Sequence, residues 1–450
     1  MNKKSTVLFI CYLMFTVLLF AQEKADQAEQ SRLNTIKYGT ETEIANLIQS
    51  LKNEGADYLD NEIIGMAQNT RNNKILTGAF AFFGEREKKG MEARALRAIE
   101  EFDEENKDTV AAAIDYIGKI KYAPAYAALT KLLEEEDKRF ANGIFRSLGK
   151  ISGPESGQSN DAALFLIDYY DNRDPGDENR RDIIASLGET GSSAAVDFLC
   201  GIADDSDGRA ALRMAALGAI AKIANPAGLE SILACIGSTD PNIRSTAVGS
   251  LGPFSGDAVD DAILDAFRDS YYRTRIAAAQ ASRQRKLAKA APFLRQRAEN
   301  DEVPNVREEA IKALGAIANA EANSILEDLF TERKNSVRVR IAAGEMLMEN
   351  EPSKHLDAFI KEIDYAKEKN QTALYNGLLK IIGQTKCPGM ENFTRRLIQQ
   401  NGIAEKTYAL DIAANNRLTS LSSEIKALAS DKNESLARRA RRTMETLGIQ

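Results

Sequence analysis

Residues able to perform acid–base, nucleophilic or metal chemistry are few in this chain of 450 residues. The only histidine, His355, lies in the segment Glu-Pro-Ser-Lys-His-Leu, which we expect to be a surface loop. One imidazole excludes a metal site built from several histidines and leaves histidine-based proton transfer with a single candidate. No Gly-rich phosphate loop, nucleophile elbow or paired-cysteine metal motif occurs. We therefore expect no enzymatic activity, no cofactor and no metal site.

Charged residues offer a different kind of site. Residues 271–297 carry eight basic side chains and no acidic one, and two tyrosines begin the stretch. Such a stretch could bind an anionic partner, with the aromatic rings adding contact area. The alternative is that these charges only cover the outer face of a helical array. The candidate partner-binding residues are Tyr271, Tyr272, Arg273, Arg275, Arg283, Arg285, Lys286 and Lys289, with Tyr169 and Tyr170 as further aromatic candidates.

The chain as a whole is mildly acidic, with a formal net charge of −7 and a pI of about 5.3. Residues 22–250 hold the acidic excess, whereas residues 251–450 are slightly basic. Nucleic-acid binding depends on neutralising many phosphates with lysine and arginine. We therefore expect no nucleic-acid partner.

The elements that would position these residues are predicted by an internal repeat. In the unit that begins at Asp301, Pro304 suits the first turn of a helix because a proline there loses no hydrogen bond. Apolar residues then form one helical stripe over residues 306–317 and a second over residues 322–330, separated by a polar break. Each unit is thus predicted to be two antiparallel helices.

The repeat can be followed through a small residue late in the first helix of each unit, with steps of roughly 30 to 35 residues. Arg283 and Met348 occupy this position in two units. Elsewhere it holds Gly84, Gly118, Gly149, Gly188, Ala221, Gly252, Gly315, Gly383, Ala414 and Gly448. We expect the small residue to let the paired helix pack closely. The array then has about eleven or twelve units and closes with a single helix at residues 434–447.

These segments resemble HEAT repeats, in the short variant shared by bacterial HEAT-like and phycobilisome-lyase-type repeats. Asp240-Pro241-Asn242-Ile243-Arg244 followed by Leu251-Gly252 carries the resemblance, which recurs from about Glu41 to Gly448. It implies an all-α, right-handed α–α superhelix in which the second helices line a concave face. It also implies that the recurring Asp and Arg form a structural ladder between units, so Asp240, Arg244 and Arg307 are not candidate functional residues.

The first 21 residues follow the plan of a secretory signal: two lysines, an apolar run over residues 5–20, then Ala21. An uncleaved membrane anchor and lipidation at Cys11 are alternatives. We expect an exported, periplasmic or envelope protein with divergent helical repeats at residues 22–105 as a cap and HEAT-like repeats at residues 106–450. The leading hypothesis is a non-enzymatic scaffold that binds a protein partner on its concave surface. The alternatives are an envelope protein that binds anionic lipid or polymer through residues 271–297, and an enzyme built on HEAT-like repeats.

Overall fold

A computed structural model describes residues 27–135 and 137–449, and the signal segment predicted at residues 1–21 lies outside them. The described residues divide into two compact units, one that ends at residue 228 and one that begins at residue 229. The described residues are helical throughout, joined by short turns, and contain no β-strand. In the described part of the chain no helix combines the length and the apolar character needed to span a bilayer.

The first unit begins with helical residues 27–38. Its further helices are α2 (Glu41–Glu54), α3 (Asp60–Ala67), α4 (Asn73–Glu85), α5 (Glu92–Glu100), α6 (Lys107–Lys119), α7 (Tyr126–Glu135), α8 (Asp137–Ile151), α9 (Ser159–Asn172), α10 (Asp177–Thr190), α11 (Val196–Asp204) and α12 (Ala210–Ile223). The helices of the second unit are α13 (Leu229–Ile236), α14 (Pro241–Ser250), α15 (Asp257–Ala266), α16 (Tyr272–Arg285), α17 (Ala291–Asn300), α18 (Pro304–Ile317), α19 (Ala320–Thr331), α20 (Val337–Asn350), α21 (Pro352–Glu368), α22 (Thr372–Gln384), α23 (Glu391–Ile398), α24 (Ile403–Asn415), α25 (Ser422–Leu428) and α26 (Glu434–Leu447).

The unit chosen from the sequence shows why the helices form where they do. Helix α18 begins at Pro304, as predicted, and ends where Ala318 takes a left-handed conformation with φ 50°. Helix α19 begins after Asn319, whose side-chain oxygen accepts a hydrogen bond from the Ala322 N–H at 2.7 Å. An Asn at this position satisfies one of the backbone donors that the first helical turn leaves unpaired. The predicted all-α architecture of antiparallel helix pairs is confirmed.

Helix pairing differs from the prediction by one helix. Each helix that carries the repeat pattern packs more extensively against the helix before it than against the helix after it, so α17 pairs with α18 and α19 with α20. On this basis α3 to α26 form twelve pairs. We call the first helix of each pair the A helix (odd numbers) and the second the B helix (even numbers). Helix α26 is therefore the B helix of a complete last pair with α25, not an unpaired closing helix.

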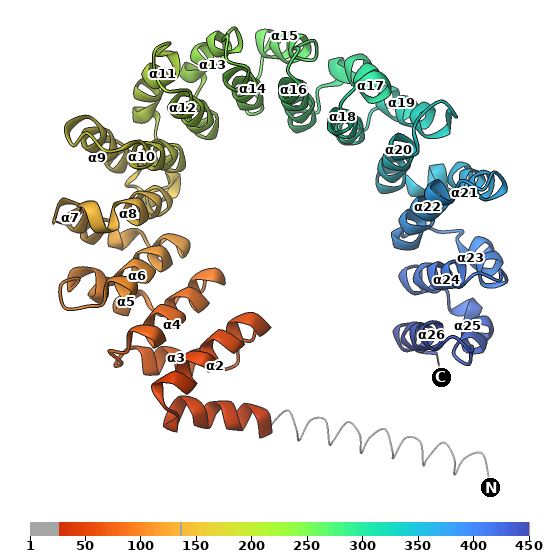
Figure 1. Cartoon of the computed structure of the whole chain (residues 1–450), viewed down its shortest axis with the longest axis horizontal. Coiled ribbons are helices and arrows are strands. Elements are labelled where there is room, and N and C mark those ends of the chain that lie inside the picture. Colours follow the sequence, from red (N-terminus) through yellow and green to blue (C-terminus); the bar gives the residue numbers. More distant parts are fainter. Residues whose placement is uncertain (1–26, 136, 450) are drawn as a thin grey trace. The chain divides into compact units, whose positions relative to one another are not determined.

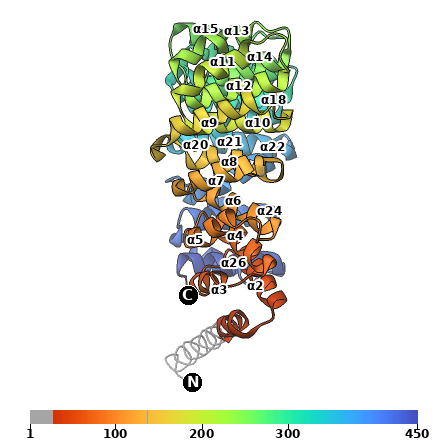
Figure 2. The same cartoon turned by 90° about the vertical axis from the view of Figure 1, so that its left-hand side faces the viewer.

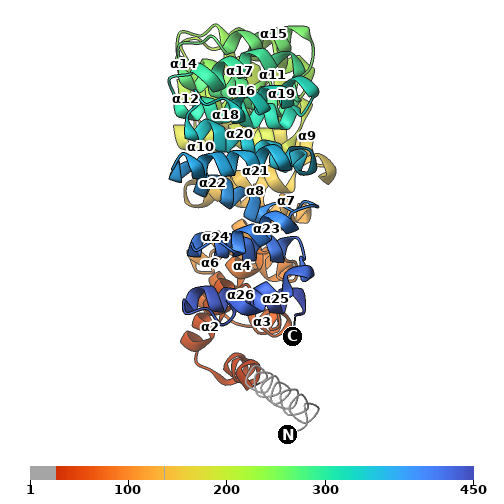
Figure 3. The same cartoon turned by 90° about the vertical axis from the view of Figure 1, so that its right-hand side faces the viewer.

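Each unit has two layers. In Figure 1 the B helices α4, α6, α8, α10 and α12 follow one another along the concave edge of the first unit, with α5, α7, α9 and α11 outside them. The B helices α14 to α24 do the same in the second unit. Figure 2 shows the first unit from its side, and Figure 3 shows α19, α21, α23 and α25 of the second. Residues 304–317 and their equivalents, predicted as first helices, thus line the concave face.

The recurring glycines explain this curvature and correct their predicted role. A Cβ on Gly118 would lie 2.5 Å from the Ser147 Oγ, and one on Gly188 would lie 2.9 Å from the Ala219 Cα. Both neighbours belong to the next B helix and not to the paired A helix. Small residues therefore let consecutive B helices approach more closely than larger side chains would allow. Close spacing in the B layer makes that layer the concave one within each unit.

The predicted boundary between a divergent cap and regular repeats near residue 105 stays a prediction from sequence similarity. In the structure α4 packs directly on α6 across it. Gly84 makes the same kind of contact there as the later glycines, because its Cβ would lie 3.6 Å from the Tyr116 Cα. Consecutive B helices therefore pack on one another from α4 onward, which lies within the predicted cap.

Candidate partner-binding surfaces

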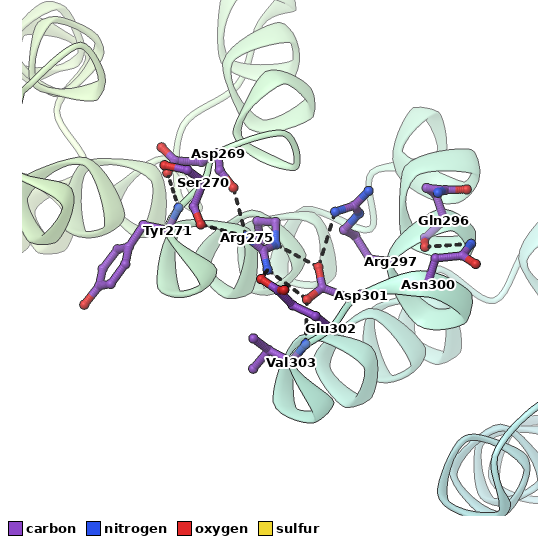
Figure 4. Close-up of polar contacts among 10 residues, drawn as sticks. All are labelled: Asp269, Ser270, Tyr271, Arg275, Gln296, Arg297, Asn300, Asp301, Glu302 and Val303. Atoms are coloured by element: carbon purple, nitrogen blue, oxygen red, sulfur yellow. Dashed lines mark hydrogen bonds and ion pairs between the residues drawn. The ribbon is translucent and has the colours of Figure 1, made fainter.

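Two arginine–aspartate bridges, one buried and one half-buried, tie successive repeats of the second unit together. Arg275 on α16 donates to the Asp301 carboxylate through Nε at 2.7 Å and through Nη2 at 2.8 Å. Its remaining terminal nitrogen donates to the backbone oxygens of Asp269 and Ser270 (Figure 4). Arg244 on α14 binds Asp269 in the same two-pronged way, at 2.8 and 3.1 Å. The structural ladder implied by the family resemblance is therefore present between these repeats.

The environment of Asp301 keeps this bridge ionised. Burial favours the neutral carboxyl and acts to raise the pKa of Asp301, but hydrogen bonds from Arg275 and from the Val303 N–H outweigh burial. The pKa of Asp301 therefore lies below its ordinary value. Arg275 is only 5% exposed, and each of its three guanidinium nitrogens donates a hydrogen bond within the protein, so it is not available to a partner, contrary to the prediction from the basic stretch.

Several other cations of residues 271–297 are also paired with carboxylates of neighbouring helices. Arg285 contacts Asp260 at 2.5 Å, and Lys289 lies 3.3 Å from Asp257. Arg283 lies 3.7 Å from Glu309. These acids come from outside the stretch, so the absence of acidic residues within it does not create a continuous basic surface. The run of arginine and lysine serves largely to hold repeats together.

The exposed part of the predicted site without carboxylate partners is smaller. Arg283 and Lys289 are exposed but paired, whereas Arg273 and Lys286 are exposed and pair with no carboxylate among the described residues, and Tyr271 and Tyr272 are half-buried. The two tyrosine rings meet edge to face with centroids 5.4 Å apart, and Arg273 lies beside both rings. The Tyr271 hydroxyl is 3.0 Å from the Asn242 Oδ1. Partner binding by Tyr271, Tyr272, Arg273 and Lys286 stays a prediction.

Tyr169 and Tyr170 are adjacent in sequence but lie in different surroundings. Tyr169 is buried and packs edge to face on Phe145, with ring centroids 5.2 Å apart. Its position is that of a core residue, so it is not a surface contact. Tyr170 is half-buried, packs on Phe198 at 5.1 Å and lines a cavity of about 540 Å³ between α9, α10, α11 and α12. Only Tyr170 is placed where a partner can reach it.

His355 is not in a surface loop. It lies in the first turn of α21 and is 5% exposed. Its Nδ1 is 3.5 Å from Glu327 and its Nε2 is 3.8 Å from Glu351. Burial lowers the pKa of His355, an effect that these two glutamates only partly offset. In the described residues no group of three or more His, Cys, Asp or Glu side chains is arranged to hold a metal ion.

The sequence did not indicate the recesses between B helices. One lies between α18, α20 and α22, has a volume of about 520 Å³ and is lined by Val337, Ile341 and Met346. Both Glu308 and Lys312 stand at its rim. A second lies between α6 and α8 and has a volume of about 650 Å³. Each recess forms where side chains of successive repeats meet. Because the sequence of one repeat resembles that of its neighbours, it does not show where such a recess lies.

Comparison with known families agrees with this architecture. The family model described as spirochaete HEAT repeat protein matches residues 36–443. The chain belongs to this family. No curated protein matches the chain.

Among solved structures, one HEAT-repeat protein shares this fold at low sequence identity. Yeast importin-β (Kap95p) aligns with a TM-score of 0.51 and 12% identity, covering 93% of this chain and 72% of that one. The karyopherin Kap121p, bound to the extreme C-terminus of the protein phosphatase Cdc14p, aligns with a TM-score of 0.45 and 12% identity. That alignment covers 92% of this chain and 53% of Kap121p, so the chain spans about half the length of that relative. At such identity the likeness concerns the HEAT-repeat fold alone.

Proposed function

We propose that this HEAT-repeat protein is an exported, non-enzymatic scaffold that binds a protein partner along its B-helix surface. The observation that supports it most is the recess between α18, α20 and α22. Val337 is 37% exposed, and it lies beside the half-buried Ile341 and Met346. An exposed apolar floor of this kind is typical of the centre of a protein interface.

The rim of the recess favours a protein over an anionic lipid or polymer. Arg338 pairs with Glu308, and Lys312 lies 2.7 Å from Glu309. Glu345 also lines the recess and is exposed. Carboxylates at the rim would repel a uniformly anionic ligand, whereas a protein segment can match both signs of charge. Residues 271–297 give the anionic alternative less support, because most of their cations already have carboxylate partners.

The experiment is chemical crosslinking in native cells followed by identification of the proteins captured by the full chain. The double variant V337S/M346S removes apolar surface from the recess and should reduce recovery of the specific partner at least about fivefold. The matched control is Leu164→Ser, which removes an apolar side chain that is 57% exposed on the A helix α9. Equal capture by wild type, V337S/M346S and the control, with all three folded, would overturn the proposal.

Export is tested separately. We expect the protein recovered from the cell envelope to begin at Gln22, after removal of the 21-residue signal. Mass spectrometry of the N-terminus, together with cell fractionation, measures this directly. Recovery of a chain that begins at Met1 in the cytosolic fraction would contradict export.

A further inference from the structure

We propose that the second unit has a hinge between α18 and α20, and that this hinge moves one wall of the α18–α20–α22 recess. The recess supports the proposed function, but the motion does not depend on that function and can be measured without a partner. The inference rests on an interruption of the arginine–aspartate ladder at this junction. The packing of the two helices agrees with it.

The ladder follows a fixed register where it is complete. An arginine three residues after the start of one B helix binds an aspartate three residues before the start of the next B helix. Arg244 and Asp269 have this register between α14 and α16. Arg275 and Asp301 have it between α16 and α18 (Figure 4). Each aspartate also accepts a hydrogen bond from the backbone N–H two residues later, which fixes the turn before the B helix.

The same register has no aspartate at the next junction. Arg307 lies three residues after the start of α18, but the residue three before the start of α20 is Lys334. Lys334 pairs with Glu332 at 2.8 Å. The half-buried guanidinium of Arg307 forms no ion pair or hydrogen bond with any described residue. The role that the family resemblance implies for Arg307 is therefore not fulfilled at this junction.

Both helices are bound more tightly to their other neighbours. Arg275 of α16 binds Asp301, in the turn before α18, and this ion pair is buried. Arg340 of α20 binds Glu362 of α21, and this pair is buried too. The two buried ion pairs flank the α18–α20 junction without crossing it. Helix α20 also packs on α18 less extensively than α18 packs on α16.

The contacts between α18 and α20 differ at the two ends of the helices, which run in the same direction. At the C-terminal ends, the Asn350 side chain donates to the Gly315 backbone oxygen at 2.7 Å, and Met346 lies against Gly315. At the N-terminal ends, the exposed Arg338 pairs with Glu308. An exposed ion pair contributes little, because water screens it. The helices are thus held together at one end and free to separate at the other, which is a hinge arrangement.

The recess lies where the helices can separate. Val337, Arg338 and Ile341, from the first two turns of α20, line it on one side. Glu308 and Ile311 of α18 line it on the other. Rotation of α20 about its C-terminal contacts changes the distance between these two walls. The recess can therefore adjust to partner segments of different thickness, which a rigid junction would not allow.

The hinge is measured by double electron–electron resonance on the full chain. Spin labels are attached to ketone-bearing unnatural residues, so that the native cysteines stay in place. Labels at Glu302 and Lys369 span α18, α20 and α22, and labels at Thr239 and Glu302 span the bridged helices α14, α16 and α18. All three positions are exposed residues outside the helices. The hinge predicts a distance distribution at least about twice as wide for Glu302 and Lys369 as for Thr239 and Glu302.

A rung built into the gap identifies the cause of the motion. K334D places a carboxylate at the ladder position, where it can bind Arg307, and should narrow the Glu302–Lys369 distribution by at least about one third. R307Q/K334D should restore the wild-type width, because the new carboxylate then has no guanidinium. K334Q is the matched control, since it removes the same lysine without adding a carboxylate. It should leave the width within about 15%, because the pair of the exposed Lys334 with Glu332 contributes little.

Equal widths for the two label pairs in the wild type would overturn the hinge. No narrowing by K334D would overturn the assignment of the hinge to the missing rung. The same holds if K334Q narrows the distribution as much as K334D, or if the narrowing persists without Arg307. Urea denaturation of each variant confirms that it is folded. None of these measurements needs a partner, so failure here is distinct from failure of the V337S/M346S experiment.

Discussion

Arg275 and Asp301 are 26 residues apart in the chain and form a buried, two-pronged ion pair, with N–O distances of 2.7 and 2.8 Å. The pair joins α16 to the turn that precedes α18. Helix α18 is the next B helix. Arg244 and Asp269 repeat the arrangement one repeat earlier. The bridge fixes the register of one repeat on the next, which is the interface on which the stability of a solenoid depends.

Arg275→Ala is expected to lower the free energy of unfolding by about 3 to 5 kcal/mol, because it leaves the buried Asp301 carboxylate without its partner. Urea denaturation of the full chain at pH 7 measures this. Arg273→Ala, two residues away and exposed, is the control and should change stability by no more than about 0.5 kcal/mol. Similar losses in the two variants would show that the bridge is not the cause.

His355→Gln should flatten the pH dependence of stability between about pH 8 and pH 5. Burial lowers the pKa of His355 in the folded protein, against the attraction of Glu327 and Glu351 and with the repulsion of Lys354. Below the unfolded pKa, about 6.5, the unfolded chain therefore binds a proton that the native chain does not. Stability of the wild type must then fall as the pH decreases through 6.5 toward the lower folded pKa.

Thermal denaturation at pH 8, 7, 6 and 5 measures this difference between the wild type and H355Q. Loss of packing contributes equally at every pH, so only the slope identifies the titration of His355. A wild-type chain whose stability rose from pH 8 to pH 5 relative to H355Q would contradict the lowered pKa.

Gly188→Ala is expected to destabilise the first unit by about 1 to 3 kcal/mol, because the added methyl must push α12 away from α10. A Cβ at Gly188 would lie 2.9 Å from the Ala219 Cα and 3.0 Å from the Ala219 Cβ. Gly218→Ala, on α12, is the matched control, since a Cβ there meets nothing within 4 Å. It should stabilise by about 0.5 to 1 kcal/mol through helix propensity. Calorimetry of both variants checks the opposite signs.

Within the basic stretch, exposed and paired cations should behave differently. Arg273→Glu with Lys286→Glu should leave stability unchanged within about 0.5 kcal/mol, because both side chains are exposed. Arg285→Ala should cost about 1 kcal/mol, since it removes the closer partner of the half-buried Asp260, which keeps Lys289 at 3.4 Å. Urea denaturation distinguishes the two. Loss of partner capture in the first variant, with an intact fold, would support binding at Arg273 and Lys286.

The sequence by itself determined the helical repeat, because apolar periodicity and caps act over a few residues. Pro304 marks a helix start that the structure confirms, whereas α19 already begins at Ala320, within the polar break predicted from the sequence. The ladder implied by the pattern Asp240 to Arg244 was also found, in the neighbouring pairs. Local information was enough for these features, since each helix carries the signals that begin it, end it and orient its apolar stripe.

Only the tertiary structure decided which helix lies inside, which charge is paired and where the surface is hollow. The sequence placed Gly188 against its own paired helix, whereas it faces Ala219 of the next B helix. The sequence predicted that Arg275 binds a partner, whereas Arg275 forms an ion pair with Asp301 in the structure. These outcomes depend on contacts between residues about one repeat apart. A periodic sequence offers many similar neighbours at that distance, and packing selects among them.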